Sequence, residues 1–165
     1  MNIRRILTHE SARLREIRLK ALADAPTAFG STLAEAQAHP GDAWDHQAAD
    51  EARSATRARF AAEENGRWYG MAAGFLIPEQ PGTVQLVSMW VDPARRGSGV
   101  GTALVEAVVE WARGRSAKRV QLWVTVSNSQ AKALYARTGF AETERVQPLP
   151  SDPRLQQVLM VRELA

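Results

Sequence analysis

The chain has 165 residues, 45% of them hydrophobic and 24% charged, which is typical of a globular protein with one core. Its formal net charge of +3 suits an anionic ligand at one site better than a nucleic-acid-binding face, and the absence of cysteine excludes disulfides, thiolate metal sites and cysteine nucleophiles. There is no stretch of about 18 apolar residues, and the charged N-terminus has no signal-peptide core. We therefore expect one cytoplasmic domain over residues 1–165, with neither membrane nor nucleic acid as a partner.

The first half of the chain predicts helices followed by hairpin strands. Apolar residues at helical spacing predict a helix over residues 12–23, which ends before Pro26 because the residue preceding a proline avoids the α conformation. Alternating apolar and polar residues after position 54 predict strands, and Asn65-Gly66 is a hairpin turn. The expected elements are a strand at 1–7, a helix at 12–23, a loop with a short helix at 27–38, a helix at 42–52 and strands at 55–63 and 67–77.

The second half alternates strands and helices. A strand rich in valine ends at Asp92-Pro93, and an amphipathic helix follows. The expected elements are a strand at 83–91, a helix at 100–113, a strand at 118–126, a helix at 130–137, a strand from 140, a loop at 148–153 and a strand at 155–164. This order predicts an α/β fold with a mixed sheet, hairpins in its first half and a right-handed crossover in the middle.

Three glycines, Gly97, Gly99 and Gly101, lie between the strand at 83–91 and the next helix, after Arg95 and Arg96. A helix N-terminus offers free amides and a partial positive charge, and glycine lets a phosphate approach the backbone. No lysine follows as in a P-loop, and the alternating spacing differs from a dinucleotide fingerprint. The loop therefore predicts a phosphate-bearing ligand other than ATP or NAD, although these residues alone also fit a flexible turn without a ligand.

Two motifs in this order resemble the GNAT superfamily of acyl-CoA-dependent N-acyltransferases. The segment from Arg96 to Gly101 matches the family pattern Gln/Arg-x-x-Gly-x-Gly/Ala, and residues 128–140 match Asn-x-x-Ala-x-x-Leu-Tyr-x-x-x-Gly-Phe. The order of elements supports the resemblance over nearly the whole chain. It implies a mixed sheet of about seven strands flanked by about four helices, with a β-bulge and a splay in the strand at 83–91.

The resemblance also implies a set of ligand contacts. Acetyl-CoA is the expected co-substrate, and no metal is expected. Backbone groups of one strand would bind the pantetheine arm, the glycine loop would hold the pyrophosphate, and Asn128 would contact the cofactor beyond the thioester. The implied cofactor-binding residues are Met89, Trp90, Val91, Arg96, Gly97, Ser98, Gly99, Val100, Gly101, Thr102 and Asn128.

Tyr135 is the catalytic residue that the resemblance implies, at the thioester sulfur. A phenol with an ordinary pKa near 10 stays protonated at neutral pH and can donate its proton to the departing thiolate. A strand amide around Met89 would stabilise the oxyanion. Two alternatives stay open at this point: Tyr135 can be a core residue with its hydroxyl at the surface, and Asn128 can cap a helix.

The general base and the acceptor are left open by the sequence. The strand at 83–91 contains no acid, and Trp123 stands where some relatives carry a glutamate. An amine that is already partly neutral, or a water held by the backbone and Ser88, could replace a side-chain base. Glu79, His9, His39 and His46 are further candidates for the base, but a solvated surface role is the simpler interpretation for each of them. Aromatic residues could line an acceptor pocket or simply fill the core; the candidates are Phe29, Trp44 and Trp123, with Trp90 as a fourth.

The sequence thus predicts an N-acetyltransferase that transfers an acetyl group to a primary amine of a small molecule or peptide. The alternative is a non-catalytic acyl-CoA-binding module of the same fold, which the missing base allows. A homodimer through the final strand is also compatible with the sequence, because dimers are common among the proteins that it resembles.

Overall fold

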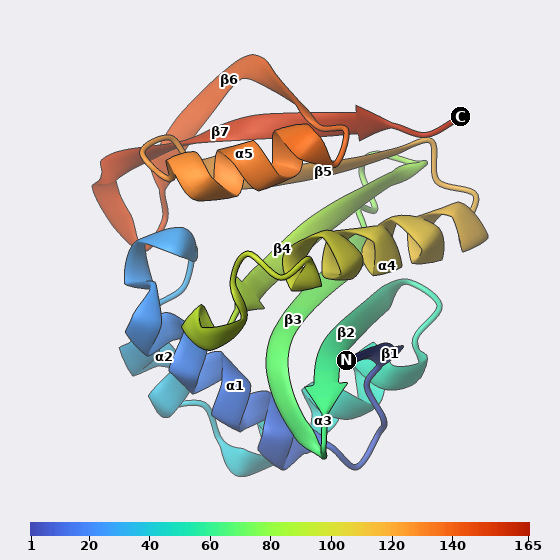
Figure 1. Cartoon of the computed structure of the whole chain (residues 1–165), viewed down its shortest axis with the longest axis vertical. Helices are drawn as coiled ribbons and strands as arrows, with labels where there is room; N and C mark the ends of the chain where they lie inside the picture. The colour runs from blue at the N-terminus through green and yellow to red at the C-terminus, as the bar shows by residue number, and fades with distance from the viewer.

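A computed structural model describes residues 1–165, which form a mixed seven-stranded sheet in the order β1-β2-β3-β4-β5-β7-β6 (Figure 1). All neighbouring strands are antiparallel except β4 and β5. The strands are β1 (Asn2–Arg5), β2 (Arg57–Glu64), β3 (Arg67–Leu76), β4 (Thr83–Val91), β5 (Arg119–Thr125), β6 (Ala141–Leu149) and β7 (Asp152–Glu163). The predicted α/β class and the seven-stranded mixed sheet are confirmed.

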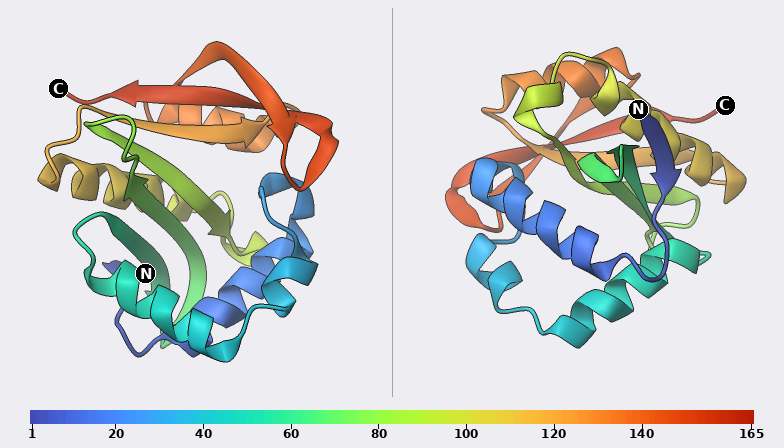
Figure 2. Two further views of the ribbon diagram at one scale, coloured as in Figure 1. Left: turned by 180° about the vertical axis from the view of Figure 1, so that it is seen from behind. Right: turned by 60° about the horizontal axis from the view of Figure 1, so that its bottom comes forward.

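Five α-helices flank the sheet, which matches the five helical segments expected from the residues, whereas the family resemblance implied about four. They are α1 (Ser11–Asp24), α2 (Leu33–Gln37), α3 (Gly41–Arg53), α4 (Val100–Gly114) and α5 (Ser129–Arg137), with short 3₁₀ turns η1 (Pro26–Ala28) and η2 (Pro93–Arg95). Figure 2 shows α4 and α5 on one side of the sheet and α1, α2 and α3 on the other. None of the helices is both long and apolar enough to cross a membrane.

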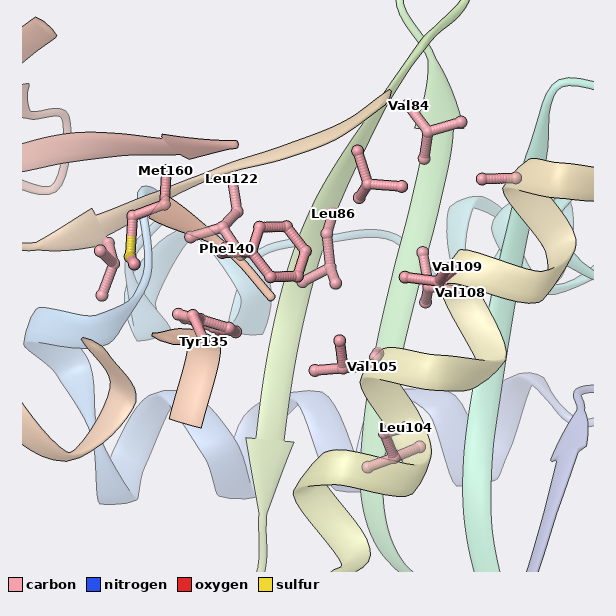
Figure 3. Close-up of a cluster of buried hydrophobic side chains, with 14 of the residues drawn as sticks. Val84, Leu86, Leu104, Val105, Val108, Val109, Leu122, Tyr135, Phe140 and Met160 are labelled. Carbon is pink, nitrogen blue, oxygen red and sulfur yellow. The ribbon is translucent and has the colours of Figure 1, made fainter. Parts of the chain in front are cut away.

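Two apolar clusters lie on opposite faces of the sheet because neighbouring strand residues point in opposite directions. Ala62 and Ala72 face α4, whereas Ala61 and Met71 face α1 and α3. The cluster under α4 also contains side chains of β5, β7 and α5 (Figure 3). Burying one such aliphatic side chain contributes about 1.5–3 kcal/mol to folding.

Helix α4 packs closely on β3 because glycine leaves room for it. A Cβ atom at Gly70 would lie 2.9 Å from Leu104 Cδ1, and one at Gly74 would lie 2.8 Å from Val108 Cγ1. Both separations are too short for a side chain. The buried stripe of α4, which includes Leu104, Val105 and Val108, thereby reaches the backbone of the central strands (Figure 3).

Strands β4 and β5 separate along most of their length. They pair only at Thr83↔Arg119, Val84↔Val120 and Gln85↔Gln121. Further along β4, Met71 of β3 pairs with Trp90 and Ala73 pairs with Val87, so that two residues of β4 stand opposite one of β3. This is a β-bulge. The expected bulge and splay are therefore present, and the splay already begins after Gln85.

The prediction of a loop over residues 148–153 is wrong for most of these residues. Strand β6 continues to Leu149, β7 begins at Asp152, and only Pro150 and Ser151 form the turn between them. Pro148 fits because β6 is the edge strand and pairs on one side only, so the missing N–H breaks no ladder bond.

Candidate functional site

The backbone of the glycine loop follows a path that glycine alone adopts readily. Gly97 and Gly99 have φ values of +79° and +88°, and Gly99 is the N-cap of α4. A Cβ atom at either position would have no neighbour within 4 Å. These two glycines are therefore required by the backbone conformation and not by crowding.

The loop presents a continuous run of unpaired backbone amides. Ala103 is the first residue of α4 whose N–H has a partner, the carbonyl of Gly99 at 3.0 Å. The N–H groups of residues 97–102 have no acceptor within the protein. Together with the partial positive charge of the helix N-terminus, they form a site for a phosphate or another anion.

Gly101 has a different role, because it lies where three elements meet. A Cβ atom there would stand 3.1 Å from Leu134 Cδ2 of α5 and 3.3 Å from Met89 Cε of β4. The side chain of Met89 therefore lies against the start of α4, beside the free amides. This contact connects the separated part of β4 to the anion-binding loop.

Arg96 joins the loop to the end of α1. Its Nε donates to the carbonyl of Val91 at 2.9 Å, and its terminal nitrogen donates to Asp24 Oδ2 at 2.6 Å. The indole N–H of Trp90 donates to the same oxygen at 3.0 Å. The Trp90 and Arg96 hydrogen bonds hold the pKa of the Asp24 carboxyl below its usual value. Arg96 thus ties the glycine loop to α1. The Val91 carbonyl, which was expected to bind the cofactor, already accepts a hydrogen bond from Arg96.

Tyr135 and Asn128 lie at the two ends of α5. Asn128 Oδ1 accepts from the backbone N–H of Ala131 at 3.2 Å, so it caps the helix. Tyr135 is 6% exposed, and its ring meets the ring of Phe140 edge-on at 5.9 Å (Figure 3). Burial raises the pKa of the Tyr135 phenol, so it is protonated at neutral pH.

A cavity of about 420 Å³ lies on the other face of the sheet, between the sheet and the segments around α1 and α3. Polar and charged residues make up about half of its lining. The polar residues that line it are Arg18, Ser31, Gln47, Glu51, Arg57, Arg59, Gln85, Ser88 and Gln157. Of the aromatic residues singled out in the sequence, Phe29 and Trp123 line the cavity.

Trp44 does not reach the cavity, so its suggested place in an acceptor pocket is not supported. It is 4% exposed and packs in the apolar cluster between α1 and α3, with its ring edge-on to His39. His9, His46 and Glu79 also lie away from the cavity. The structure therefore brings none of the four candidate bases to this site.

None of the four charged residues of the cavity was singled out from the sequence. Glu51 is 1% exposed, and its Oε2 accepts from Arg59 Nε at 2.8 Å. Its Oε1 is buried without a partner. The other two are Arg18 and Arg57. A charged residue inside an apolar helical stripe was the available signal: Glu51 follows Trp44 and Ala48 on one face of α3.

The cavity and the loop meet at the bulge of β4. Ser88, with φ +57°, lines the cavity, and the next residue, Met89, lies against Gly101 on the opposite face. A ligand between the separated strands could bind the free amides from one side and meet a second molecule from the other. This arrangement suits group transfer between two substrates.

Comparisons with known proteins agree with this geometry. The Acetyltransferase (GNAT) family matches residues 20–140. An uncharacterised N-acetyltransferase of Methanocaldococcus jannaschii is 37% identical over 91 residues, covering 53% of this chain and 40% of that protein. The mycothiol acetyltransferase of Salinispora tropica is 36% identical over 106 residues, covering 52% of this chain and 34% of that protein. The chain thus spans well under half of the length of either relative.

A solved structure extends the likeness to the whole fold. The Salmonella typhimurium protein yncA, solved with its cofactor acetyl-CoA, superimposes with a TM-score of 0.82 at 22% identity, covering 100% of this chain and 94% of that one. The family match contains the glycine loop, the bulge of β4 and all of α5. The chain therefore belongs to the GNAT family of acetyltransferases.

Proposed function

We propose that the protein is an acetyl-CoA-dependent N-acetyltransferase that acetylates a primary amine of a small molecule or peptide. The observation that carries the proposal is the bulge of β4, where Met89 borders the free amides of the loop and Ser88 borders the cavity. The acetyltransferase family supports the reaction type. The cavity, of about 420 Å³, has the size of a small-molecule site.

The amides of residues 97–102 are the proposed pyrophosphate site. Beyond Gln85, β4 has no partner strand on the side of β5, so its backbone can pair with the pantetheine arm as with an added strand. Met89 and Trp90 would supply these groups. The Salmonella typhimurium structure was solved with acetyl-CoA, which supports the choice of co-substrate.

Acetyl-CoA supplies the acetyl thioester, and the residues around the bulge act on it. The acceptor enters from the cavity as a neutral amine and attacks the carbonyl carbon. The N–H of Met89 donates to the carbonyl oxygen as negative charge develops there. The C–S bond breaks, the sulfur takes a proton from the Tyr135 phenol, and the proton lost by the amine returns through water to Tyr135. Burial keeps that phenol protonated until the sulfur departs.

The Tyr135→Phe variant tests the proposal. We expect kcat to fall by roughly 10²-fold or more, as for the loss of a general acid, because the ring keeps its packing against Phe140 but no longer donates a proton. The affinity for acetyl-CoA, measured by calorimetry, should stay within a factor of about three, since one hydroxyl is a minor part of the proposed contacts.

A panel of amines, screened by thiol release from acetyl-CoA, identifies the substrates needed for this comparison. Turnover by the wild type with an unchanged rate in Tyr135→Phe would remove the catalytic role of the phenol. Acetyl-CoA binding without turnover of any amine would instead favour the non-catalytic acyl-CoA-binding module, which the lack of a base on β4 allows.

A further inference from the structure

We propose that the acceptor amine also carries a carboxylate and that Arg18 binds it, an inference that rests on the proposed acetyltransferase function. Arg18 lies on α1 and lines the cavity. The side chain donates to Ser31 Oγ at 2.6 Å and to Ser88 Oγ at 3.4 Å. Its guanidinium carbon lies 5.1 Å from the centre of the Phe29 ring. The guanidinium is therefore held in place at the bulge, beside the proposed reaction centre.

Arg18 differs from the other arginines of the cavity in having no acid as a partner. Arg59 pairs with Glu51 at 2.8 Å, and Arg57 pairs with Asp50 at 3.7 Å. The contacts of Arg18 are hydroxyls and an aromatic face. Burial and the nearby charge of Arg59 lower the pKa of Arg18 to about 10, so it remains charged at neutral pH. A half-buried, charged guanidinium without an acidic partner favours an anionic ligand.

The charges around the cavity disfavour a polycationic acceptor. Three arginines line it, Arg18, Arg57 and Arg59, and Glu51 is the one carboxylate among the lining residues. An acceptor with several ammonium groups would be repelled. A carboxylate matches the flat guanidinium through two parallel hydrogen bonds, and its position at Ser88 places it within a few bonds of an amine at the bulge.

Glu51, the one acid among the lining residues, does not neutralise Arg18. It is 1% exposed, and its Oε2 accepts from Arg59 Nε at 2.8 Å. The guanidinium of Arg18 therefore stays available for the carboxylate of an acceptor. A small amino acid is the simplest acceptor that combines such a carboxylate with a primary amine.

The test compares amino acids with their carboxamides. Each proteinogenic amino acid that the wild type acetylates is paired with its C-terminal amide, and kcat/KM is measured for both. We expect the acid to be preferred by about tenfold or more, as for one charge-assisted pair. Amidation lowers the pKa of the amine and leaves more of it neutral, so this preference cannot come from the reactivity of the amine.

The Arg18→Gln variant should lose this preference to within a factor of about two, whereas Arg18→Lys should keep part of it. Arg15→Gln is the matched control. Arg15 lies on the same helix and is exposed, so this substitution removes the same charge outside the cavity. Acetyl-CoA affinity and the thermal midpoint show that each variant is folded. Equal kcat/KM values for acid and amide in the wild type, or an unchanged preference in Arg18→Gln, would overturn the inference and leave the proposed function intact.

Equilibrium binding separates the two proposals when no product forms. The same acids and amides are titrated by calorimetry into protein saturated with coenzyme A. Binding of an acid but not its amide, lost in Arg18→Gln, would support the carboxylate site although the transferase proposal had failed. Binding of both alike, or of neither, would overturn the carboxylate site itself.

Discussion

At the scale of single residues, Gly99 sets the direction of the proposed pyrophosphate site. Its φ of +88° turns the chain into α4, and the amides on either side of it have no acceptor in the protein. An L side chain in such a conformation costs about 1–3 kcal/mol of strain. Nothing stands within 4 Å of a Cβ atom placed there, so a substitution acts on the backbone alone.

We therefore expect Gly99→Ala to weaken acetyl-CoA binding by about tenfold or more, because relief of the strain moves the amides out of line. The free energy of unfolding should fall by only about 1–2 kcal/mol. Calorimetry and urea denaturation measure the two effects. Gly114→Ala is the control, since Gly114 lies at the other end of α4 in open space and without positive φ. Wild-type affinity in Gly99→Ala would place the phosphate site elsewhere.

At the scale of elements, a hydrogen bond between two glutamines closes the point where β4 and β5 separate. Gln121 Nε2 donates to Gln85 Oε1 at 2.9 Å, and both residues belong to the last pair of the parallel ladder. Both side chains are buried, at 6% and 8% exposure for Gln121 and Gln85. A buried amide that loses its partner bears a desolvation cost of about 1–3 kcal/mol.

Gln121→Leu should therefore lower the free energy of unfolding by about 1–3 kcal/mol, because it leaves the Gln85 oxygen without its donor. The double variant Gln85→Leu/Gln121→Leu should cost less than the sum of the two single variants, since no amide is then left unpaired. Urea denaturation of the four proteins of the cycle measures the coupling. Purely additive losses would mean that the two side chains do not stabilise the junction as a pair.

Local patterns predicted the elements of the sheet and the anion-binding loop. The valine-rich composition of residues 83–91 and the helical spacing of apolar residues in 100–113 predicted segments that correspond closely to β4 and α4. The free amides of the loop are also local, because they follow from where α4 begins. Pro148 was misleading, since its place in a strand depends on β6 being at the edge, which the pairing of distant segments decides.

The cavity depended mainly on contacts between distant segments, and among its charged residues only Glu51 had a local signal. Arg18, Glu51 and Ser88 come from α1, α3 and β4, which are far apart in the chain and meet only in the folded sheet. The sequence suggested aromatic residues instead, because their size predicts burial but not which surface they face. Trp44 and Trp123 are both tryptophans, yet only Trp123 reaches the cavity.

At the scale of the whole molecule, the sheet consists of two parts joined by a short ladder. Strands β1 to β4 form one part, β5, β7 and β6 form the other, and only three residue pairs connect β4 to β5 (Figure 1). On one face, α4 lies over β2, β3 and β4 of the first part, and α5 lies over β5 and β7 of the second (Figure 1). A ligand between the parts would replace missing strand pairing and stabilise the folded state as it binds.

This arrangement predicts a distinct pattern of hydrogen exchange. Amides of residues 97–102 have no acceptor and should exchange rapidly in the free protein, directly from the folded state. Acetyl-CoA should slow their exchange and that of residues 89–91, because its phosphates and pantetheine arm would accept from these groups. The amide of Gly82, which lies in the turn before the other end of β4 and has no acceptor in the chain, should exchange at the same rate with and without the ligand. Hydrogen exchange followed by mass spectrometry measures these rates. Equal slowing at Gly82 and at residues 97–102 would contradict binding in the gap. Stabilisation of the fold without local contact does not protect amides that exchange directly from the folded state.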